Sequence, residues 1–226
     1  MMKIISILFF CLLNFLSCVH AQKNIGNDGF PDSWWIEIPL DQVKDWEIPP
    51  QAARRDLGEV ILSKRTELGI FSNLSEAHFV LDGQKYSSIE GLWQGMKYPE
   101  NNQDERLKDP NIIWPYTREQ VYKMSGFEAK KAGDLANENM KKLGIKWITY
   151  QGEKIEYNSD SGQIKHYNII YKASLEKVKQ NENIKNLLLQ TKSLKFKPDH
   201  TQQPNPKPAY LYFDIYMRIR NEIKAE

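Results

Sequence analysis

Short apolar runs separated by turn residues predict β-structure between residues 57 and 86. Residues 57–62 form one apolar stretch, which predicts a strand. Residues 79–81 and 85–86 flank Asp82 and Gly83, and an Asp-Gly pair between such runs is the strongest short signal for a hairpin turn. We therefore expect a short β-hairpin here.

After the hairpin the apolar spacing changes to that of a helix. Ser87 stands three residues before Glu90, which predicts a capping box at the helix start. Apolar residues then follow at the i, i+3, i+4, i+7 spacing of a buried stripe up to Pro99: Ile89, Leu92, Trp93 and Met96. We expect this stripe to face the core.

A second stripe on the same helix is polar. Glu90, Gln94 and Lys97 stand at i, i+4 and i+7, so they share one face over two turns. By spacing alone, this face is either solvated with a weak ion-pair ladder, or a site that places a carboxylate, an amide and an ammonium together.

The second half of the chain predicts mostly helix. Residues 118–140 read as helical with a break at Ser125 and Gly126, and with Phe127 as a packing position. Residues 145–148 predict a short strand or a helix start, and 151–163 a surface hairpin. The remaining predicted helices are 167–178, 184–189 and 209–223, with a proline-containing loop over 197–208. The expected fold class is α+β, mainly helical.

The N-terminal part divides into a leader and an arm. Residues 1–21 carry an early Lys3, an apolar run and a small-x-small end at Ala21, which predicts a signal peptide and export to the periplasm or the medium. An alternative is lipid attachment at Cys18. The leader holds both cysteines, and its apolar run is too short to span a bilayer.

Residues 22–56 are rich in Trp and Pro and predict an extended arm, followed by one domain over 57–226. Trp34, Trp35 and Trp46 are expected to pin the arm to the domain surface. The functional alternative is an arm that covers a binding cleft.

Composition and charge narrow the function classes. The chain has 226 residues and a net charge of +2, from 31 Lys and Arg against 29 Asp and Glu, which does not favour a nucleic-acid partner. It contains no phosphate-binding loop, no dinucleotide fingerprint and no paired Cys or His at metal spacing. His78, His166 and His200 are scattered, so we expect neither a metal nor a cofactor.

One set of motifs resembles a known family. The chain carries a Phe-Ser-Asn turn, an Asp-Gly hairpin, and a helix with a Glu, a Gln one turn on and a Lys-aromatic pair: Phe71-Ser72-Asn73, Asp82-Gly83, Glu90, Gln94 and Lys97-Tyr98. This pattern resembles the NADAR (YbiA-like) family. Weaker similarities follow at residues 127–133, at Lys146-Trp147 and at 187–191, so the resemblance covers roughly residues 57–220.

The resemblance implies a compact, mainly helical domain that hydrolyses N-glycosidic bonds. Substrates in this family include phosphoribosylated pyrimidine intermediates of riboflavin synthesis and ADP-ribose attached to guanine. Glu90 matches the family's essential glutamate and Trp147 its pocket tryptophan. Asn73 and Lys97 match its polar residues, and Lys130 lies in its Ala-Lys helix.

Two departures from the family pattern stand out. Gly91 occupies the place of a histidine that usually follows the glutamate. Near the C-terminus, Asp199 and His200 stand where relatives have an acidic residue, a Trp-Gly pair and a Gly-rich loop. Either Asp199 replaces the missing acid, with His200 beside the substrate, or the second half of the site is absent.

These residues suit the hydrolysis of an N-glycoside, whose transition state is positive at the anomeric carbon. Glu90 is expected to stabilise that charge and orient water, and Asp199 or an amide such as Gln94 to hold the leaving base. Lys97 or Lys130 would bind phosphate and Trp147 would stack on the base.

The expected ligand is therefore a nucleotide or ADP-ribosyl conjugate. Because the predicted leader directs export, the cytosolic riboflavin intermediates fit less well than extracellular NAD or ADP-ribosyl compounds. Two alternatives remain: a binding module without catalysis, and a surface protein that uses its Trp-rich arm to contact partners. The pattern does not predict an oligomeric state.

Overall fold

Six α-helices carry most of the regular backbone between residues 25 and 224, the part of the chain that the computed structural model describes. They are α1 (Ile89–Gly95), α2 (Arg118–Tyr122), α3 (Gly126–Lys142), α4 (Asp160–Lys179), α5 (Glu182–Gln190) and α6 (Tyr212–Ile223). Three two-stranded sheets accompany them within the same residues. The fold is α+β and mainly helical, as predicted.

The strands are short and pair in three places. β1 (Glu59–Ile61) and β6 (Lys195–Lys197) pair in parallel, which joins the start of the domain to its end. β2 (Phe79–Leu81) and β3 (Gln84–Tyr86) form the predicted hairpin. Asp82 and Gly83 both have positive φ, at 49° and 80°, as this tight turn requires. β4 (Ile148–Tyr150) and β5 (Glu153–Ile155) form a second hairpin, shorter than the one predicted over 151–163.

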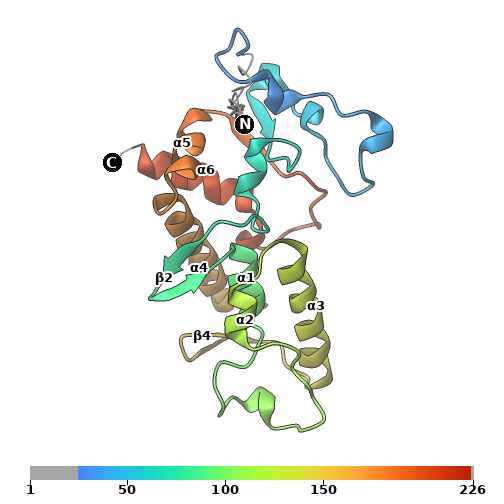
Figure 1. Cartoon of the computed structure of the whole chain (residues 1–226), viewed down its shortest axis with the longest axis vertical. Coiled ribbons are helices and arrows are strands. Elements are labelled where there is room, and N and C mark those ends of the chain that lie inside the picture. The colour runs from blue at the N-terminus through green and yellow to red at the C-terminus, as the bar shows by residue number, and fades with distance from the viewer. Residues whose placement is uncertain (1–24, 225–226) are drawn as a thin grey trace, which may run out of the picture.

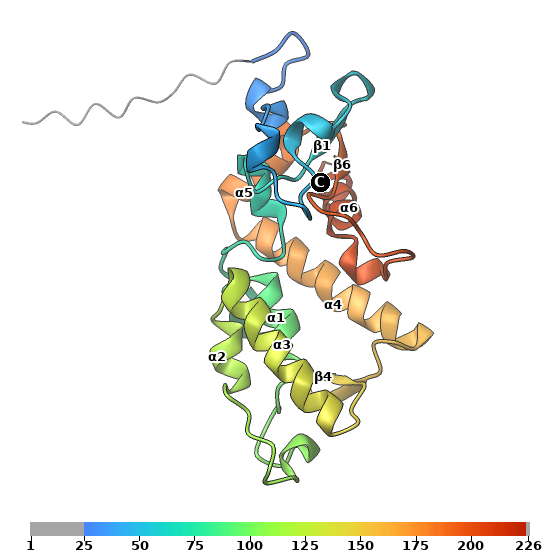
Figure 2. The same ribbon diagram turned by 90° about the vertical axis from the view of Figure 1, so that its right-hand side faces the viewer.

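Helix α4 joins two groups of elements. Figures 1 and 2 show α1, α2, α3 and the β4 hairpin at one end of the molecule, and the arm, α5, α6 and the β1–β6 pair at the other. α4 runs between them and packs against both α1 and α6. One large apolar core follows this helix, and a smaller one lies between the end of α1 and α3. The cavity described below opens where the two groups meet.

The start of α1 differs from the prediction by one residue. Ser88 is the N-cap, and its Oγ accepts a 2.8 Å hydrogen bond from the Gly91 amide. The predicted capping box from Ser87 to Glu90 is therefore wrong. The reason is steric, because a Cβ on Gly91 would lie 2.6 Å from the Met124 carbonyl oxygen, and this close approach fixes the helix start against the end of α2. Glu90 is left free of the cap.

The apolar stripe of α1 is buried as predicted, with Ile89, Leu92 and Met96 at 0% exposure. The break at Ser125 and Gly126 is also confirmed, because α2 ends at Tyr122 and α3 begins at Gly126 with a positive φ of 58°. Phe127 is not a packing position: it is 67% exposed. It stands in the first turn of α3.

The arm follows the domain surface in a series of short 3-10 turns. Trp34 is fully buried and its Nε1 donates to Glu67 Oε1 over 2.7 Å, while Trp35 Nε1 donates to the Glu59 carbonyl. Trp46 is half exposed and does not pin the arm in this way.

The predicted leader, with Cys11 and Cys18, lies outside the described residues. Between residues 25 and 224, none of the helices combines the length and the apolar character that a bilayer-crossing segment needs.

Candidate functional site

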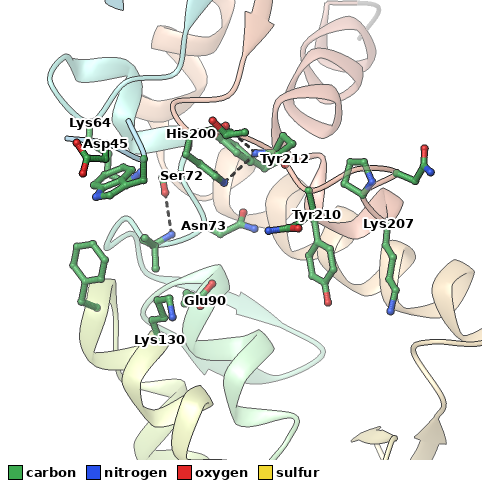
Figure 3. Close-up of a pocket in the computed structure, with 18 residues that line it drawn as sticks. Asp45, Lys64, Ser72, Asn73, Glu90, Lys130, His200, Lys207, Tyr210 and Tyr212 are labelled. Carbon is green, nitrogen blue, oxygen red and sulfur yellow. Dashed lines mark hydrogen bonds between the residues drawn. The ribbon is translucent and has the colours of Figure 1, made fainter. Parts of the chain in front are cut away.

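A cavity of about 880 Å³ lies between the two groups of elements. Its walls come from four parts of the chain: the arm, the segment from Lys64 to Leu74, the helices α1 and α3, and the loop from His200 to Tyr212. Figure 3 shows Lys64 and Asp45 on one side, with Glu90 and Lys130 opposite them. The size suits a nucleotide-sized ligand.

Glu90 is the partly buried acid of this cavity. It is the second residue of α1, and its amide donates 2.9 Å to the Asn73 carbonyl, which ties the helix start to the Phe-Ser-Asn turn. Its Oε1 accepts a 2.7 Å hydrogen bond from Gln94 Nε2, one turn further on. Burial raises the pKa of Glu90, although Gln94 and the nearby Lys97 oppose the shift. A carboxylate held this way is suited to taking a proton.

The polar stripe of α1 is not a solvated face, because its last two side chains are buried. Gln94 is 6% and Lys97 4% exposed. Gln94 packs against α3 at Gly133, where a Cβ would lie 1.8 Å from Gln94 Oε1. The Lys97 ammonium lies 4.8 Å from the centre of the Trp93 ring, and burial lowers its pKa to about 8 against the attraction of Glu90. Neither side chain lines the cavity. Gln94 affects Glu90 through its hydrogen bond, and Lys97 affects it through its charge.

Asn73 lines the cavity beside Glu90. Its Oδ1 is buried and has no hydrogen-bond partner among the described residues. The turn that carries it is held from below by Lys177 of α4, whose ammonium donates 2.7 Å to the Ile70 carbonyl and 2.7 Å to Ser75 Oγ. The Asn73 amide oxygen therefore sits on an anchored turn at the cavity wall.

Asp199, the predicted second acid, lies behind the cavity wall. Its side chain is 3% exposed and forms an ion pair with Lys64. His200 Nδ1 lies 2.8 Å from Asp199 Oδ1, and the Tyr212 hydroxyl donates to the same oxygen over 3.1 Å. Burial raises the pKa of Asp199, but the hydrogen bonds from His200 and Lys64 outweigh it and hold the pKa below its usual value. Asp199 does not line the cavity itself. The three side chains that contact it do: Lys64, His200 and Tyr212.

Of the other predicted binding residues, Lys130 lines the cavity and Trp147 does not. Lys130 pairs with Asp134 on its own helix at 2.9 Å. The Trp147 ring lies at the start of β4, between Arg106 at 4.7 Å and Lys154 at 4.5 Å. Within the described residues, no group of three or more His, Cys, Asp or Glu side chains is placed to hold a metal ion.

No protein-family profile matches the chain, and no curated protein matches it. The chain is similar in structure to the E. coli protein YbiA. The NMR structure of YbiA aligns with 79% of this chain and 94% of that one, at 18% sequence identity and a TM-score of 0.46.

The structure gives a steric reason for glycine at position 91. A side chain larger than hydrogen at position 91 would meet the Met124 carbonyl at 2.6 Å and the Val121 carbonyl at 2.9 Å. Gly91 is thus required by the packing of α1 on α2. The space that a histidine would need is filled by backbone in this protein.

Several cavity residues were missed by the sequence analysis. Asp45 and Trp46 come from the arm, Lys64 follows β1, Lys207 comes from the proline-containing loop, and Tyr210 comes from the 3-10 turn after it. The arm therefore contributes to the cavity wall. The sequence did contain one signal for a cavity residue in the arm. Trp46 is an aromatic residue in a segment that is too polar and too rich in proline to bury it.

An aromatic cluster lies at the Tyr210 end of the cavity. His166 stacks on Trp93 with ring centres 4.1 Å apart, and the rings of Tyr157 and Tyr210 meet it edge-on. His166 is 1% exposed, and neither ring nitrogen has a hydrogen-bond partner among the described residues. Burial lowers its pKa to about 3, so it is neutral at physiological pH.

Proposed function

We propose that this protein hydrolyses the N-glycosidic bond of a ribosyl or ADP-ribosyl nucleotide, with Glu90 as the catalytic carboxylate. The observation that carries the proposal is the environment of Glu90, which sits in a nucleotide-sized cavity, is buried enough to have a raised pKa, and is oriented by Gln94. Lysines at positions 64, 130 and 207 line the same cavity and supply charge for phosphate groups.

The residues suit such a reaction in one step. The bond between the anomeric carbon and the base nitrogen breaks, and its electron pair leaves with the base. Glu90 stabilises the positive charge on the sugar and accepts a proton from the water whose oxygen bonds to the anomeric carbon. Gln94 fixes the carboxylate, and the unpartnered Asn73 Oδ1 is suited to accept a hydrogen bond from a sugar hydroxyl.

The proposal gives Asp199 a positioning role. Its carboxylate orients His200 and the Lys64 ammonium toward the cavity, and does not itself reach a ligand there. The predicted leader adds that the reaction takes place outside the cytoplasm, which favours NAD or ADP-ribosyl compounds as substrates.

The test is chromatography of bases released from NAD, ADP-ribosylated guanosine and phosphoribosylamines by the purified protein. Release by the wild type, and loss of at least ~100-fold in Glu90→Gln, is the expected result. Glu138→Gln, an exposed acid of α3 away from the cavity, is the matched control and should retain full activity.

One observation favours a second candidate, a nucleotide-binding module without catalysis: the predicted second acid is withdrawn behind the wall in its pair with Lys64. This candidate predicts that ADP-ribose raises the melting temperature while no base is released from any compound. Release of base that survives Glu90→Gln contradicts both.

A further inference from the structure

Trp46 and Phe127 are the most exposed of the aromatic side chains that line the cavity, and Tyr210 is less exposed, at 37%. Trp46 is 50% and Phe127 67% exposed. They come from separate parts of the chain, the arm and the first turn of α3. Exposed rings on the walls of a cavity are surfaces on which a planar group can stack.

Trp46 is held in place by its neighbours. Glu47 accepts two hydrogen bonds from the Arg65 guanidinium, at 2.8 and 2.7 Å, and the Ile48 amide donates 2.8 Å to the Asp199 carbonyl. Glu47 also pairs with His200 in an antiparallel bridge. The residues on the C-terminal side of Trp46 are therefore anchored to the domain, which presents the ring at a fixed place.

Phe127 is fixed by its helix. The Gly126 amide donates 2.7 Å to the Leu74 carbonyl, which anchors the start of α3 to the turn that carries Asn73. Phe127 lines both the main cavity and an adjoining cavity of about 430 Å³, as do Lys64 and Leu74. The ring thus stands on the boundary between the two spaces.

Each ring has a lysine beside it. The Lys64 ammonium lies 5.9 Å from the centre of the Trp46 ring. Lys130 follows Phe127 by three residues in α3 and therefore lies on the same face. Figure 3 shows these two lysines on opposite sides of the cavity. An aromatic ring next to an ammonium suits a nucleobase joined to phosphate.

We propose that Trp46 and Phe127 bind a second nucleobase of the ligand, the one that is not cleaved, and that its phosphates lie along Lys64 and Lys130. The ligand is then of the dinucleotide type, with an adenine or similar ring remote from the bond at Glu90. This inference depends on the proposed function in one respect only, the identity of the bond that is cleaved. Enclosure in a cavity of about 880 Å³ and a net charge of +2 favour a small ligand over a nucleic acid.

The test measures binding without turnover. AMP, ADP-ribose and ribose 5-phosphate are titrated calorimetrically into the full protein carrying Glu90→Gln, alone and combined with Trp46→Ala or Phe127→Ala. Either aromatic variant should weaken AMP and ADP-ribose about 10-fold, the size of one lost stacking contact, and leave ribose 5-phosphate within about 2-fold. Leu40→Ala, an 85% exposed residue of the arm, and Ile113→Ala, 79% exposed, should change nothing.

The outcomes separate this inference from the hydrolase proposal. Unchanged AMP affinity in both aromatic variants, equal loss of ribose 5-phosphate affinity, or no AMP binding at all would overturn the inference. Tighter binding of a short single-stranded DNA than of ADP-ribose, lost in the same variants, would overturn it in favour of nucleic acid. If no compound is hydrolysed but the aromatic variants still weaken AMP selectively, the base site stands and the hydrolase does not.

Discussion

Gln94 links the acid of the cavity to the packing of two helices. Its Nε2 donates 2.7 Å to Glu90 Oε1, while its Oε1 is buried against Gly133 of α3 without a hydrogen-bond partner among the described residues. The amide has one favourable contact, the one to Glu90, and an unsatisfied oxygen that costs stability. An arrangement that costs stability next to a partly buried acid is typical of a functional site.

Gly133→Ala should disturb Glu90 without touching it. The new Cβ would lie 1.8 Å from Gln94 Oε1, so the amide has to move and the hydrogen bond to Glu90 is lost. We expect a loss of about 1–3 kcal/mol in the free energy of unfolding, from overpacking, and a fall in kcat. Urea denaturation and steady-state kinetics measure the two effects.

The matched variant is Gly95→Ala, on α1, the helix that carries Glu90 and Gln94. Its Cβ would lie 2.4 Å from the Tyr122 ring of α2, so it should cost similar stability, but the strain falls on α2 and not on the contact between Gln94 and α3. If both variants lower kcat equally at equal stability, the link through Gln94 is wrong.

Glu90→Gln should stabilise the fold while it abolishes turnover. Burial raises the pKa of Glu90 in the folded protein, so its contribution to stability is present below the unfolded value and is lost as pH rises through the folded value. Glutamine removes the partly buried charge and keeps an oxygen for Gln94. We expect a gain of about 1 kcal/mol at pH 7 and none near pH 4.

Thermal denaturation of wild type and variant across this pH range is the measurement. A Glu90→Gln protein that is less stable at pH 7 would point to a structural role for the carboxylate, such as the cap that the sequence predicted.

Activity should follow a bell-shaped pH profile. Glu90 has to be deprotonated to accept a proton, so activity rises with pH through its raised pKa. On the alkaline side, the Lys97 ammonium loses its proton near pH 8, which removes a charge that favours the Glu90 carboxylate. The pH dependence of kcat/KM tests both limbs.

In Lys97→Met the alkaline limb should disappear and the acidic limb should move to higher pH, because Glu90 loses its neighbouring cation. Lys131→Met, an exposed lysine of α3, is the control and should keep the wild-type profile. An alkaline limb that persists in Lys97→Met would assign it to another group.

Asp199→Asn separates positioning from catalysis. The variant weakens the pairs with Lys64 and His200, which are charge-assisted and buried at the Asp199 end, so we expect a loss of about 2 kcal/mol in unfolding free energy. Because Asp199 does not line the cavity, kcat should fall far less than in Glu90→Gln. Turnover as low as in Glu90→Gln, at unchanged stability, would restore Asp199 as the second catalytic acid.

The local elements were predictable because local chemistry specifies them. The Asp-Gly turn needs positive φ at two positions, the α1 stripe follows the helical repeat, and the break at Gly126 needs a left-handed residue. Boundaries were less certain: α4 begins at Asp160, inside the segment predicted as a hairpin, because Ser159 caps it. The stripe of Glu90 and Gln94 was predictable for the same reason, since one helix holds it, whereas Asn73 was indicated only by the family resemblance.

Tertiary structure decided what these residues meet. Only the fold places Trp46 of the arm and Phe127 of α3 in the cavity of Glu90, moves Asp199 behind Lys64, and leaves Trp147 outside. The helix start at Ser88 likewise depends on the α2 backbone, which leaves room only for glycine at position 91. Sequence spacing determines which side chains share one element, whereas contacts between elements depend on packing across the whole chain, which no local pattern records.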